Sequence, residues 1–320
     1  MVELHRRRFL HTMAATGVMS VAVGVGQHAS AAEPRKRKFT MDLTCGAIGV
    51  GADGREAIGL AQHYGFESVA PSPHFLARLS AGELQELLAD MKAKKLAWGA
   101  TGLPVDFRGD ESAFLSGMKR LADFAAPLQR AGASRIGTWL SPSHRSLTYL
   151  TNFRLHVRRL REVAKALADH GQRLGIEYVG PKTSWTAGRY PFIHTMAEAK
   201  ELLAEINQPN VGLMLDSWHW YTAHETEADL LTLAGQEVIA CHLNDAPAGV
   251  AIDQQADGRR DLPCATGVID LKTFLGALVK IGYDGPVCAE PFSQKLIAMP
   301  KDQALQAVAA AMKAAVALVE

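Results

Sequence analysis

Residues 211–216 read VGLMLD and residues 238–245 read VIACHLND. Each segment is a short apolar run that ends in polar or ionisable side chains, which is typical of a strand buried within a parallel sheet. Six further runs of the same kind are spread along the chain. They are FTMDLTCGAIG (39–49), SVAP (68–71), AWGATGLPV (97–105), RIGTWL (135–140), IEYVG (176–180) and PVCAEPF (286–292). We therefore expect eight buried strands.

Longer segments with apolar residues at helical spacing separate these runs. One of them, SAGELQELLADMKAKK, begins at Ser80, and Ser80 and Glu83 have the spacing of a capping box. Another, FRLHVRRLREVAKALADHGQRLG, is expected to run to Gly175. Strands joined by such helices pair in parallel through right-handed crossovers. Eight strand–helix units predict an α/β fold, a (β/α)8 TIM barrel over residues 39–320.

A doubly wound open sheet is the alternative fold, but no Gly-x-Gly-x-x-Gly follows the first strand.

The composition is that of a globular protein, with 48% hydrophobic and 21% charged residues. The formal net charge is +1, so no charge excess favours nucleic acid or an anionic membrane surface as a partner. The body of the chain has no strictly apolar run of about 18 residues, which a membrane-spanning helix requires.

The cysteines form no C-x-x-C pair, so a thiolate metal site is not expected. Three of the four lie in apolar runs, where a buried reduced thiol is the expected state. The four are Cys45, Cys241, Cys264 and Cys288.

The first 32 residues have the parts of an export signal. The basic sequence RRRFL at 6–10 precedes a moderately apolar stretch at 13–25, and ASAA follows at 29–32. The Arg-Arg-x-Phe-Leu order resembles a twin-arginine signal. We expect residues 1–32 to direct export to the periplasm, with no stable membrane association after the signal is removed. A membrane anchor is the alternative, although the apolar stretch is short.

Ionisable side chains lie in or at the end of four consecutive runs: Glu177, Asp216, His242 and Glu290. In a barrel the C-terminal ends of the strands meet at one mouth, so these side chains are expected to converge. Three converging carboxylates repel one another, and no Lys or Arg on the strands is placed to neutralise them. One divalent metal ion removes this conflict. An oxygen-rich set with one imidazole suits Mn²⁺, Mg²⁺ or Co²⁺, with Zn²⁺ as a further candidate; a polar cluster without a metal is the alternative.

The segments GIEYVG, GLMLDSWHW, CHLND and CAEPF together resemble the xylose-isomerase-like barrel superfamily of sugar isomerases and ketose 3-epimerases. The resemblance covers essentially the whole chain after the expected signal. It implies that His219 binds a substrate oxygen and that Glu177 and Glu290 act as the catalytic acid–base pair. It also implies a metal-ligand set of Glu177, Asp216, His242 and Glu290.

The chain departs from this family around the substrate. Ketose epimerases carry an Arg a few residues after the strand-seven His, whereas the segment DAPAG at 245–249 has none. Related barrels often carry Arg-x-Leu-Pro-Gly-Glu-Gly in a later segment, where this chain has Arg260. Arg260 either contacts the substrate in place of the missing Arg or is a solvated charge in a loop. Lys182 is expected to take the place of an acidic residue that the family often carries after the fifth strand. His74 and Trp139 are further candidate substrate contacts, and stacking on a sugar suits Trp139 if it does not pack in the barrel.

We expect a metal-dependent sugar isomerase or epimerase that moves a proton next to a carbonyl, through a metal-bound enediolate, on a non-phosphorylated sugar or keto-sugar. No Gly-rich phosphate cradle follows strands seven and eight. The main alternative is a keto-polyol dehydratase or lyase, similar to an inosose dehydratase. Remoter alternatives are an apurinic-endonuclease-like hydrolase and a non-catalytic sugar-binding barrel. The expected partner is a small sugar and not nucleic acid, and the sequence leaves open whether the chain forms a homo-oligomer.

Overall fold

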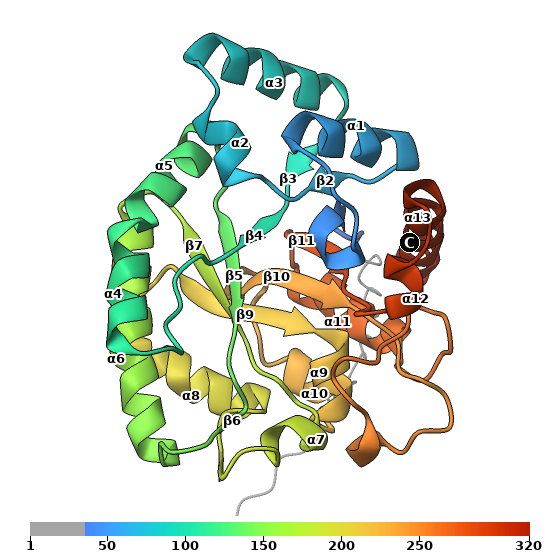
Figure 1. Cartoon of the computed structure of the whole chain (residues 1–320). Helices are drawn as coiled ribbons and strands as arrows, with labels where there is room; N and C mark the ends of the chain where they lie inside the picture. Colours follow the sequence, from blue (N-terminus) through green and yellow to red (C-terminus); the bar gives the residue numbers. More distant parts are fainter. Residues whose placement is uncertain (1–35) are drawn as a thin grey trace, which may run out of the picture. The chain divides into compact units, whose positions relative to one another are not determined.

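The computed structural model describes residues 36–320, and the expected export signal lies outside this range. Within it, the main sheet has nine strands in the order β3-β2-β1-β11-β10-β9-β7-β5-β4, and neighbouring strands are parallel. The end strands of this order, β3 (Ala97–Trp98) and β4 (Ala100–Gly102), are separated in the chain only by Gly99. They are two halves of one barrel strand, so the sheet is a nearly closed barrel with eight strand positions, as predicted (Figure 1).

Most of the predicted runs are longer than the strands they contain. Glu290, for example, lies directly after its strand rather than within it. The remaining barrel strands are β1 (Thr40–Leu43), β2 (Ser68–Val69), β5 (Arg135–Trp139), β7 (Arg173–Glu177), β9 (Val211–Asp216), β10 (Val238–Leu243) and β11 (Pro286–Ala289). A separate antiparallel pair, β6 (Ser143–His144) and β8 (Tyr190–Pro191), joins the loops that follow β5 and β7.

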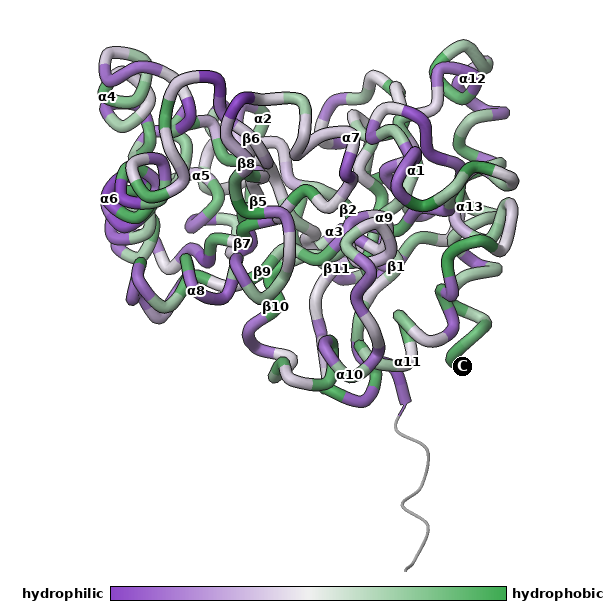
Figure 2. The backbone as a smooth tube through the Cα atoms, turned by 90° about the horizontal axis from the view of Figure 1, so that it is seen from below, coloured by the Kyte–Doolittle hydropathy of each residue, from purple (hydrophilic) through white to green (hydrophobic). Residues whose placement is uncertain are grey.

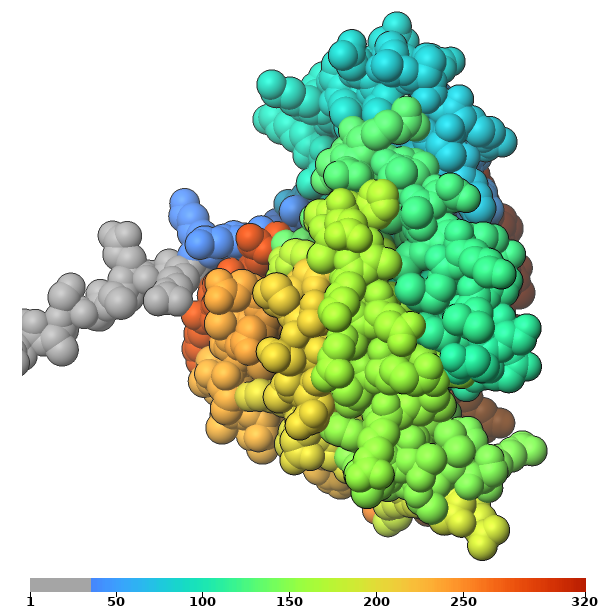
Figure 3. All heavy atoms as spheres, turned by 90° about the vertical axis from the view of Figure 1, so that its left-hand side faces the viewer, coloured from blue at the N-terminus to red at the C-terminus, as the bar shows by residue number. Residues whose placement is uncertain are grey.

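The long helices lie outside the barrel and bury one apolar side against it. In α6, for example, Leu160, Val163, Ala164 and Leu167 are buried at helical spacing, and Figure 2 shows both hydrophilic (purple) and hydrophobic (green) residues in the turns of this helix. Figure 3 shows the side of the barrel that α4, α5 and α6 cover. The long helices are α1 (Gly54–Tyr64), α3 (Ala81–Ala93), α4 (Glu111–Lys119), α5 (Leu121–Ala131), α6 (Tyr149–Ala168), α8 (Met196–Ile206), α11 (Leu271–Ile281) and α13 (Lys301–Val316). The short ones are α2 (Pro73–Ala77), α7 (Lys182–Trp185), α9 (Ser217–Thr222), α10 (Glu227–Leu230) and α12 (Gln294–Ile297).

The predicted capping box of α3 is confirmed. The Ser80 hydroxyl accepts a hydrogen bond from the Glu83 N–H at 3.3 Å, and the Glu83 carboxylate accepts one from the Ser80 N–H at 2.8 Å. These bonds satisfy two N–H groups that the first turn of a helix leaves without partners.

The boundary predicted for the fifth strand is wrong. Helix α6 ends at Ala168 instead of running to Gly175, and β7 occupies Arg173–Glu177 instead of 176–180. The turn between them places Gly171 at φ +66°, a backbone conformation that favours glycine. The polar residues Gln172 and Arg173 hid the start of the strand. Because the strand starts earlier, Glu177 is its last residue and lies at the C-terminal mouth of the barrel.

All four cysteines are unpaired, and two of the three in the predicted apolar runs are buried reduced thiols as expected. Cys241 and Cys288 are buried in strands, Cys45 is half-buried, and Cys264 is exposed. Among residues 36–320, no helix has both the length and the apolar character needed to cross a membrane.

Candidate metal centre

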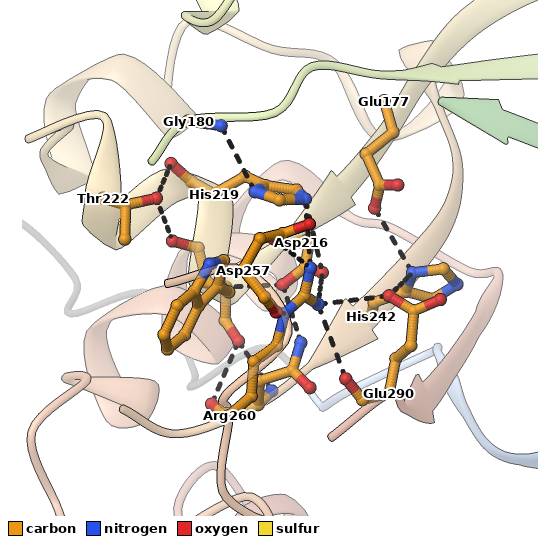
Figure 4. Close-up of polar contacts among 12 residues, drawn as sticks. Glu177, Gly180, Asp216, His219, Thr222, His242, Asp257, Arg260 and Glu290 are labelled. Atoms are coloured by element: carbon orange, nitrogen blue, oxygen red, sulfur yellow. Dashed lines mark hydrogen bonds and ion pairs between the residues drawn. The ribbon is translucent and has the colours of Figure 1, made fainter. Parts of the chain in front are cut away.

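Four side chains from neighbouring strands meet at the mouth of the barrel: Glu177, Asp216, His242 and Glu290, here called the quartet. Glu177 and Asp216 are the last residues of β7 and β9, His242 lies near the end of β10, and Glu290 follows β11. Each offers one ligand atom, and these atoms all lie within 4.8 Å of one another. Figure 4 shows Glu177, His242 and Glu290 pointing toward one another. A cation with metal–oxygen distances of about 2.0–2.6 Å can therefore join them with small side-chain movements.

The ring nitrogen of His242 supports this fit. Its Nδ1 lies 3.2 Å from Glu177 Oε1 and 3.2 Å from Glu290 Oε2. His242 Nδ1 and Glu177 Oε1 are nevertheless buried without a hydrogen bond of acceptable geometry. Buried polar atoms nearly always have a partner, so a lone pair and two carboxylates that face one point fit a shared cation.

The Asp216 carboxylate is held rigidly at the start of α9. Its Oδ1 accepts hydrogen bonds from the Trp218 N–H at 2.7 Å and from the Asn244 amide at 2.9 Å. Asp216 is thus the N-cap of the short helix and is fully buried. Asn244, which follows the strand-seven His by two residues, was not singled out in the sequence.

Arg260, which lies in the loop after β10 and not on a strand, neutralises part of the quartet. Its Nη1 donates to Asp216 Oδ2 at 2.8 Å and to Glu290 Oε2 at 3.1 Å, and its Nη2 donates to Asp257 Oδ1 at 2.7 Å. The guanidinium is buried and does not line the cavity described below. The structure therefore places Arg260 as a charge partner of two carboxylates and does not expose it as the predicted substrate contact. Among residues 36–320, only His242 forms an ion pair with Glu177.

Burial and the neighbouring charges set the protonation of the quartet. Burial raises the pKa of Glu177 to about 8, and the nearby His242 only partly opposes this. Burial acts in the same direction on Glu290, but the positive charges of His242 and Arg260 outweigh it and lower the pKa of Glu290 to about 2. Burial alone would lower the pKa of His242, whereas Glu290 raises it well above the usual value. A metal ion that binds here must displace protons from Glu177 and His242.

His219 lies beside the quartet on the Arg260 side. Its Nδ1 accepts a hydrogen bond from the Gly180 N–H at 3.2 Å, which assigns the ring proton to Nε2. Nε2 is 4.0 Å from Asp216 Oδ2 and 3.4 Å from Arg260 Nη2. Burial lowers the pKa of His219 to about 3, so the ring is a neutral N–H donor at physiological pH.

A cavity of about 410 Å³ opens onto the quartet and is within the size range of small-molecule sites. Glu177, His242 and Glu290 line it, whereas Asp216 and His219 do not. Trp139 also lines it, is 47% exposed, and has the guanidinium of Arg108 4.3 Å above its ring. Trp139 is therefore a residue of the cavity and not of the packed barrel interior.

Two other predicted contacts are not brought to this site. His74 is exposed near the start of α2 and lines a different cavity of about 530 Å³, because the chain continues beyond Val69 before it turns into that helix. Lys182 is half-exposed, and its Nζ is 2.7 Å from Asp253 Oδ2 in another loop. That pair ties the loop after β7 to the loop after β10.

One carboxyl group in the cavity was missed. Asp42 is 2% exposed in β1 and lines the same cavity as the quartet. The signal in the sequence was a carboxylate inside the first apolar run, FTMDLTC, where an uncompensated charge is unfavourable.

A nearly closed (β/α)8 barrel with four converging ligands at its strand ends defines the class of this protein. The chain belongs to the xylose isomerase-like TIM barrel family, whose model matches residues 58–315. A solved xylose isomerase domain protein from Alicyclobacillus acidocaldarius subsp. acidocaldarius is 33% identical with a TM-score of 0.71, over 82% of this chain and 92% of that one. A crystal structure of the IOLI protein with a bound zinc atom has a TM-score of 0.71 at 19% identity, over 88% of this chain and 99% of that one, and shows the shared fold alone.

Three curated enzymes are similar to part of the chain. Inosose isomerase from Bacillus subtilis (strain 168) is 28% identical over 151 residues, which is 46% of this chain and 50% of that one. 3-Dehydroshikimate dehydratase from Pseudomonas aeruginosa is 32% identical over 143 residues, 44% of this chain and 21% of that one. Ketose 3-epimerase from Arthrobacter globiformis is 28% identical over 138 residues, 42% and 40% of the two chains. The chain thus spans half or less of the length of these relatives.

Proposed function

We propose that this protein is a divalent-metal-dependent isomerase or epimerase of a non-phosphorylated sugar or keto-sugar. The observation that carries the proposal is the quartet, because two of its four members are glutamates that line one cavity from different strands. Similarity to an inosose isomerase and to a ketose 3-epimerase supports the same chemistry. The size of the cavity and the near-neutral charge of the chain support a small sugar rather than nucleic acid as the partner.

Glu177, Asp216, His242 and Glu290 would hold the metal ion. Their three carboxylates and one imidazole favour Mn²⁺, Mg²⁺ or Co²⁺, with Zn²⁺ as a further candidate. When bound, the ion supplies positive charge that stabilises negative charge developing on substrate oxygens.

The two glutamates would move the proton. Glu177 ends β7 and Glu290 follows β11, with β9 and β10 between them in the sheet, so their carboxylates approach the cavity from different sides. One would remove the proton next to the carbonyl and the other would return it on the opposite face, which is the requirement for epimerisation. Isomerisation needs a transfer along one face only.

Two neighbouring residues would complete the site. For His219 to bind a substrate oxygen through Nε2–H, as predicted, the substrate would have to reach past the wall of the cavity, because the ring is buried outside the cavity lining and its Nδ1 accepts from the Gly180 N–H. Arg260 would hold Asp216 and Glu290 in place through its bonds to both.

A dehydratase is the second candidate, because 3-dehydroshikimate dehydratase is among the relatives. Such an enzyme begins with the same proton removal and differs in that a hydroxyl group on the adjacent carbon then leaves as water.

The test is to incubate the Mn²⁺-loaded protein in D₂O with D-fructose, D-tagatose, D-ribulose and 2-keto-myo-inositol. The proposal expects deuterium next to the carbonyl of at least one of these, detected by NMR and mass spectrometry. Product analysis then separates an isomer, an epimer and a dehydrated enone. No deuterium uptake by any sugar would contradict the proposed function.

We also propose that residues 1–32 direct export through a twin-arginine pathway to the periplasm. The order of basic residues, apolar stretch and small residues supports it. Fusing residues 1–40 to a reporter protein tests it. Export should require Arg6 and Arg7, and export that survives replacement of both by Lys would refute it.

A further inference from the structure

The cavity continues below the quartet into the interior of the barrel. Successive side chains of a strand point to opposite faces, so the residue two positions before a mouth residue also points inward, one layer deeper. In TIM barrels bulky branched side chains usually fill these layers. The residues two positions before Trp139, Asp216, His242 and Glu290 line the cavity, and three of these four are small: Gly137 in β5, Met214 in β9, Ala240 in β10 and Cys288 in β11; Gly175, two positions before Glu177, does not line it.

Asp42 forms the wall of this deeper part on β1. It pairs in register with Cys288 on one side and Ser68 on the other. Its Oδ2 accepts a hydrogen bond from the Thr44 hydroxyl at 2.9 Å, whereas its Oδ1 is buried without a partner. The Ser68 hydroxyl, which shares a hydrogen bond of 2.8 Å with the Thr40 hydroxyl, also lies near the Asp42 carboxylate and lowers its pKa.

The barrel makes room for this carboxyl group. A Cβ atom on Gly99 would lie 2.1 Å from Asp42 Oδ1, so a side chain at that position would displace the acid. Gly99 is also the residue that divides β3 from β4. No Lys or Arg among residues 36–320 pairs with Asp42, so the group is not a structural ion pair. A buried carboxyl oxygen without a partner is unfavourable, and a hydroxyl group of a ligand would satisfy it.

We propose that Asp42 is a specificity-determining substrate contact that binds a hydroxyl group of a neutral polyol arm reaching below the quartet into the barrel. This rests on the proposed function for the position of the reacting carbon at the quartet. A phosphate or carboxylate on that arm would be excluded, because it would place a second anion beside Asp42. The substrate class is therefore a free keto-sugar with a hydroxyl group remote from its carbonyl.

The test compares two variants of Asp42. Asp42→Val removes every polar contact and suits a strand, whereas Asp42→Asn keeps the shape and can still bond a hydroxyl. Glu225→Gln is the matched control, since Glu225 is a carboxylate outside the cavity that accepts bonds from the Tyr178 hydroxyl and the Met196 N–H. Each Mn²⁺-loaded protein is titrated calorimetrically with the four sugars named above and with analogues of each that lack one hydroxyl remote from the carbonyl.

For at least one parent sugar, the wild type should bind the parent about 10- to 100-fold more tightly than the analogue that lacks one hydroxyl group. This is the range expected of a hydrogen bond to a buried acid. Asp42→Val should abolish that difference, Asp42→Asn should restore much of it, and Glu225→Gln should leave it unchanged. The melting temperature of Asp42→Val without sugar should equal or exceed that of the wild type, which a purely structural role would not allow.

The outcomes separate this proposal from the proposed function. Sugar binding that depends on Asp42 without deuterium exchange would overturn the function and support the contact. Deuterium exchange by the wild type, together with an Asp42→Val variant that still prefers the parent sugar to its analogue as strongly as the wild type does, would overturn the proposed Asp42 contact and support the proposed function. A melting temperature that falls in Asp42→Val, or no binding of any of the sugars to the wild type, would overturn the contact.

Discussion

Replacing Arg260 by Met should lower the stability of the metal-free protein and strengthen metal binding at the same time. The guanidinium donates to Asp216 and Glu290 at 2.8 and 3.1 Å, and it lies between the rings of Phe292 and Trp218 at 4.4 and 5.5 Å. Methionine preserves much of the apolar stem but leaves both carboxylates without their cation.

The magnitude follows from the burial of the pair. Asp216 and the Arg260 side chain are almost completely buried, and removing one partner of such a pair costs about 3–5 kcal/mol. That loss corresponds to a fall in melting temperature of roughly 10 °C for a chain of this size. A bound divalent cation compensates the same carboxylates, so with metal the loss should shrink by about 2 kcal/mol. The thermodynamic cycle then requires a Kd for the metal about 30-fold lower in the variant.

The assay combines thermal unfolding, in EDTA and in saturating Mn²⁺, with calorimetric titration of Mn²⁺. Arg259→Met is the control, because Arg259 is the exposed neighbour in the same loop and its loss should change neither quantity. An Arg260→Met protein that loses equal stability in both conditions, or that binds Mn²⁺ more weakly, would refute the assignment of Arg260 as the charge partner of the quartet.

Three further predictions concern single residues. Burial raises the pKa of Asp42 from 3.8 to about 6, so its ionisation destabilises the fold by up to about 3 kcal/mol as pH rises from 4 to above 6. Asp42→Asn in EDTA should therefore gain stability over the wild type above pH 6 and none below pH 4 in urea titrations; a gain at every pH would contradict this. Trp139→Ala should raise KM about 5- to 20-fold with little change in kcat or melting temperature, because the ring is 47% exposed at the cavity; a collapse in stability would show that it packs in the barrel. His74→Ala and Lys182→Ala should leave kcat/KM within about twofold, since neither residue lines that cavity and the Lys182–Asp253 pair is exposed; a tenfold loss of kcat/KM in either variant would show that the residue contacts the substrate.

The sequence predicted the features that follow from a regular period. Apolar runs located all eight strand positions, and the rule that parallel strands end at one mouth brought Glu177, Asp216, His242 and Glu290 together from residues more than a hundred positions apart. No local pattern could show that Arg260 folds back from the long loop after β10 onto Asp216 and Glu290, because a loop has no period that fixes where its side chains point.

Two other errors have equally specific causes. Lys182 and His74 were placed by their distance along the chain after a strand, but the loops carry them away from the cavity to Asp253 and to the start of α2. Asp42 was hidden because its run reads as an ordinary buried strand, and only the space left by Gly99, between β3 and β4, shows that the acid is accommodated.

Proton exchange next to a carbonyl should depend on a single divalent cation bound by the quartet. The most direct measurement titrates Mn²⁺ into the EDTA-treated protein in D₂O, with free Mn²⁺ followed by EPR and deuterium in the ketose followed by NMR. Exchange should rise with bound Mn²⁺, saturate at one ion per chain, and be absent together with tight binding in His242→Ala. Full exchange in the metal-depleted protein, or tight binding and exchange that persist in His242→Ala, would contradict it.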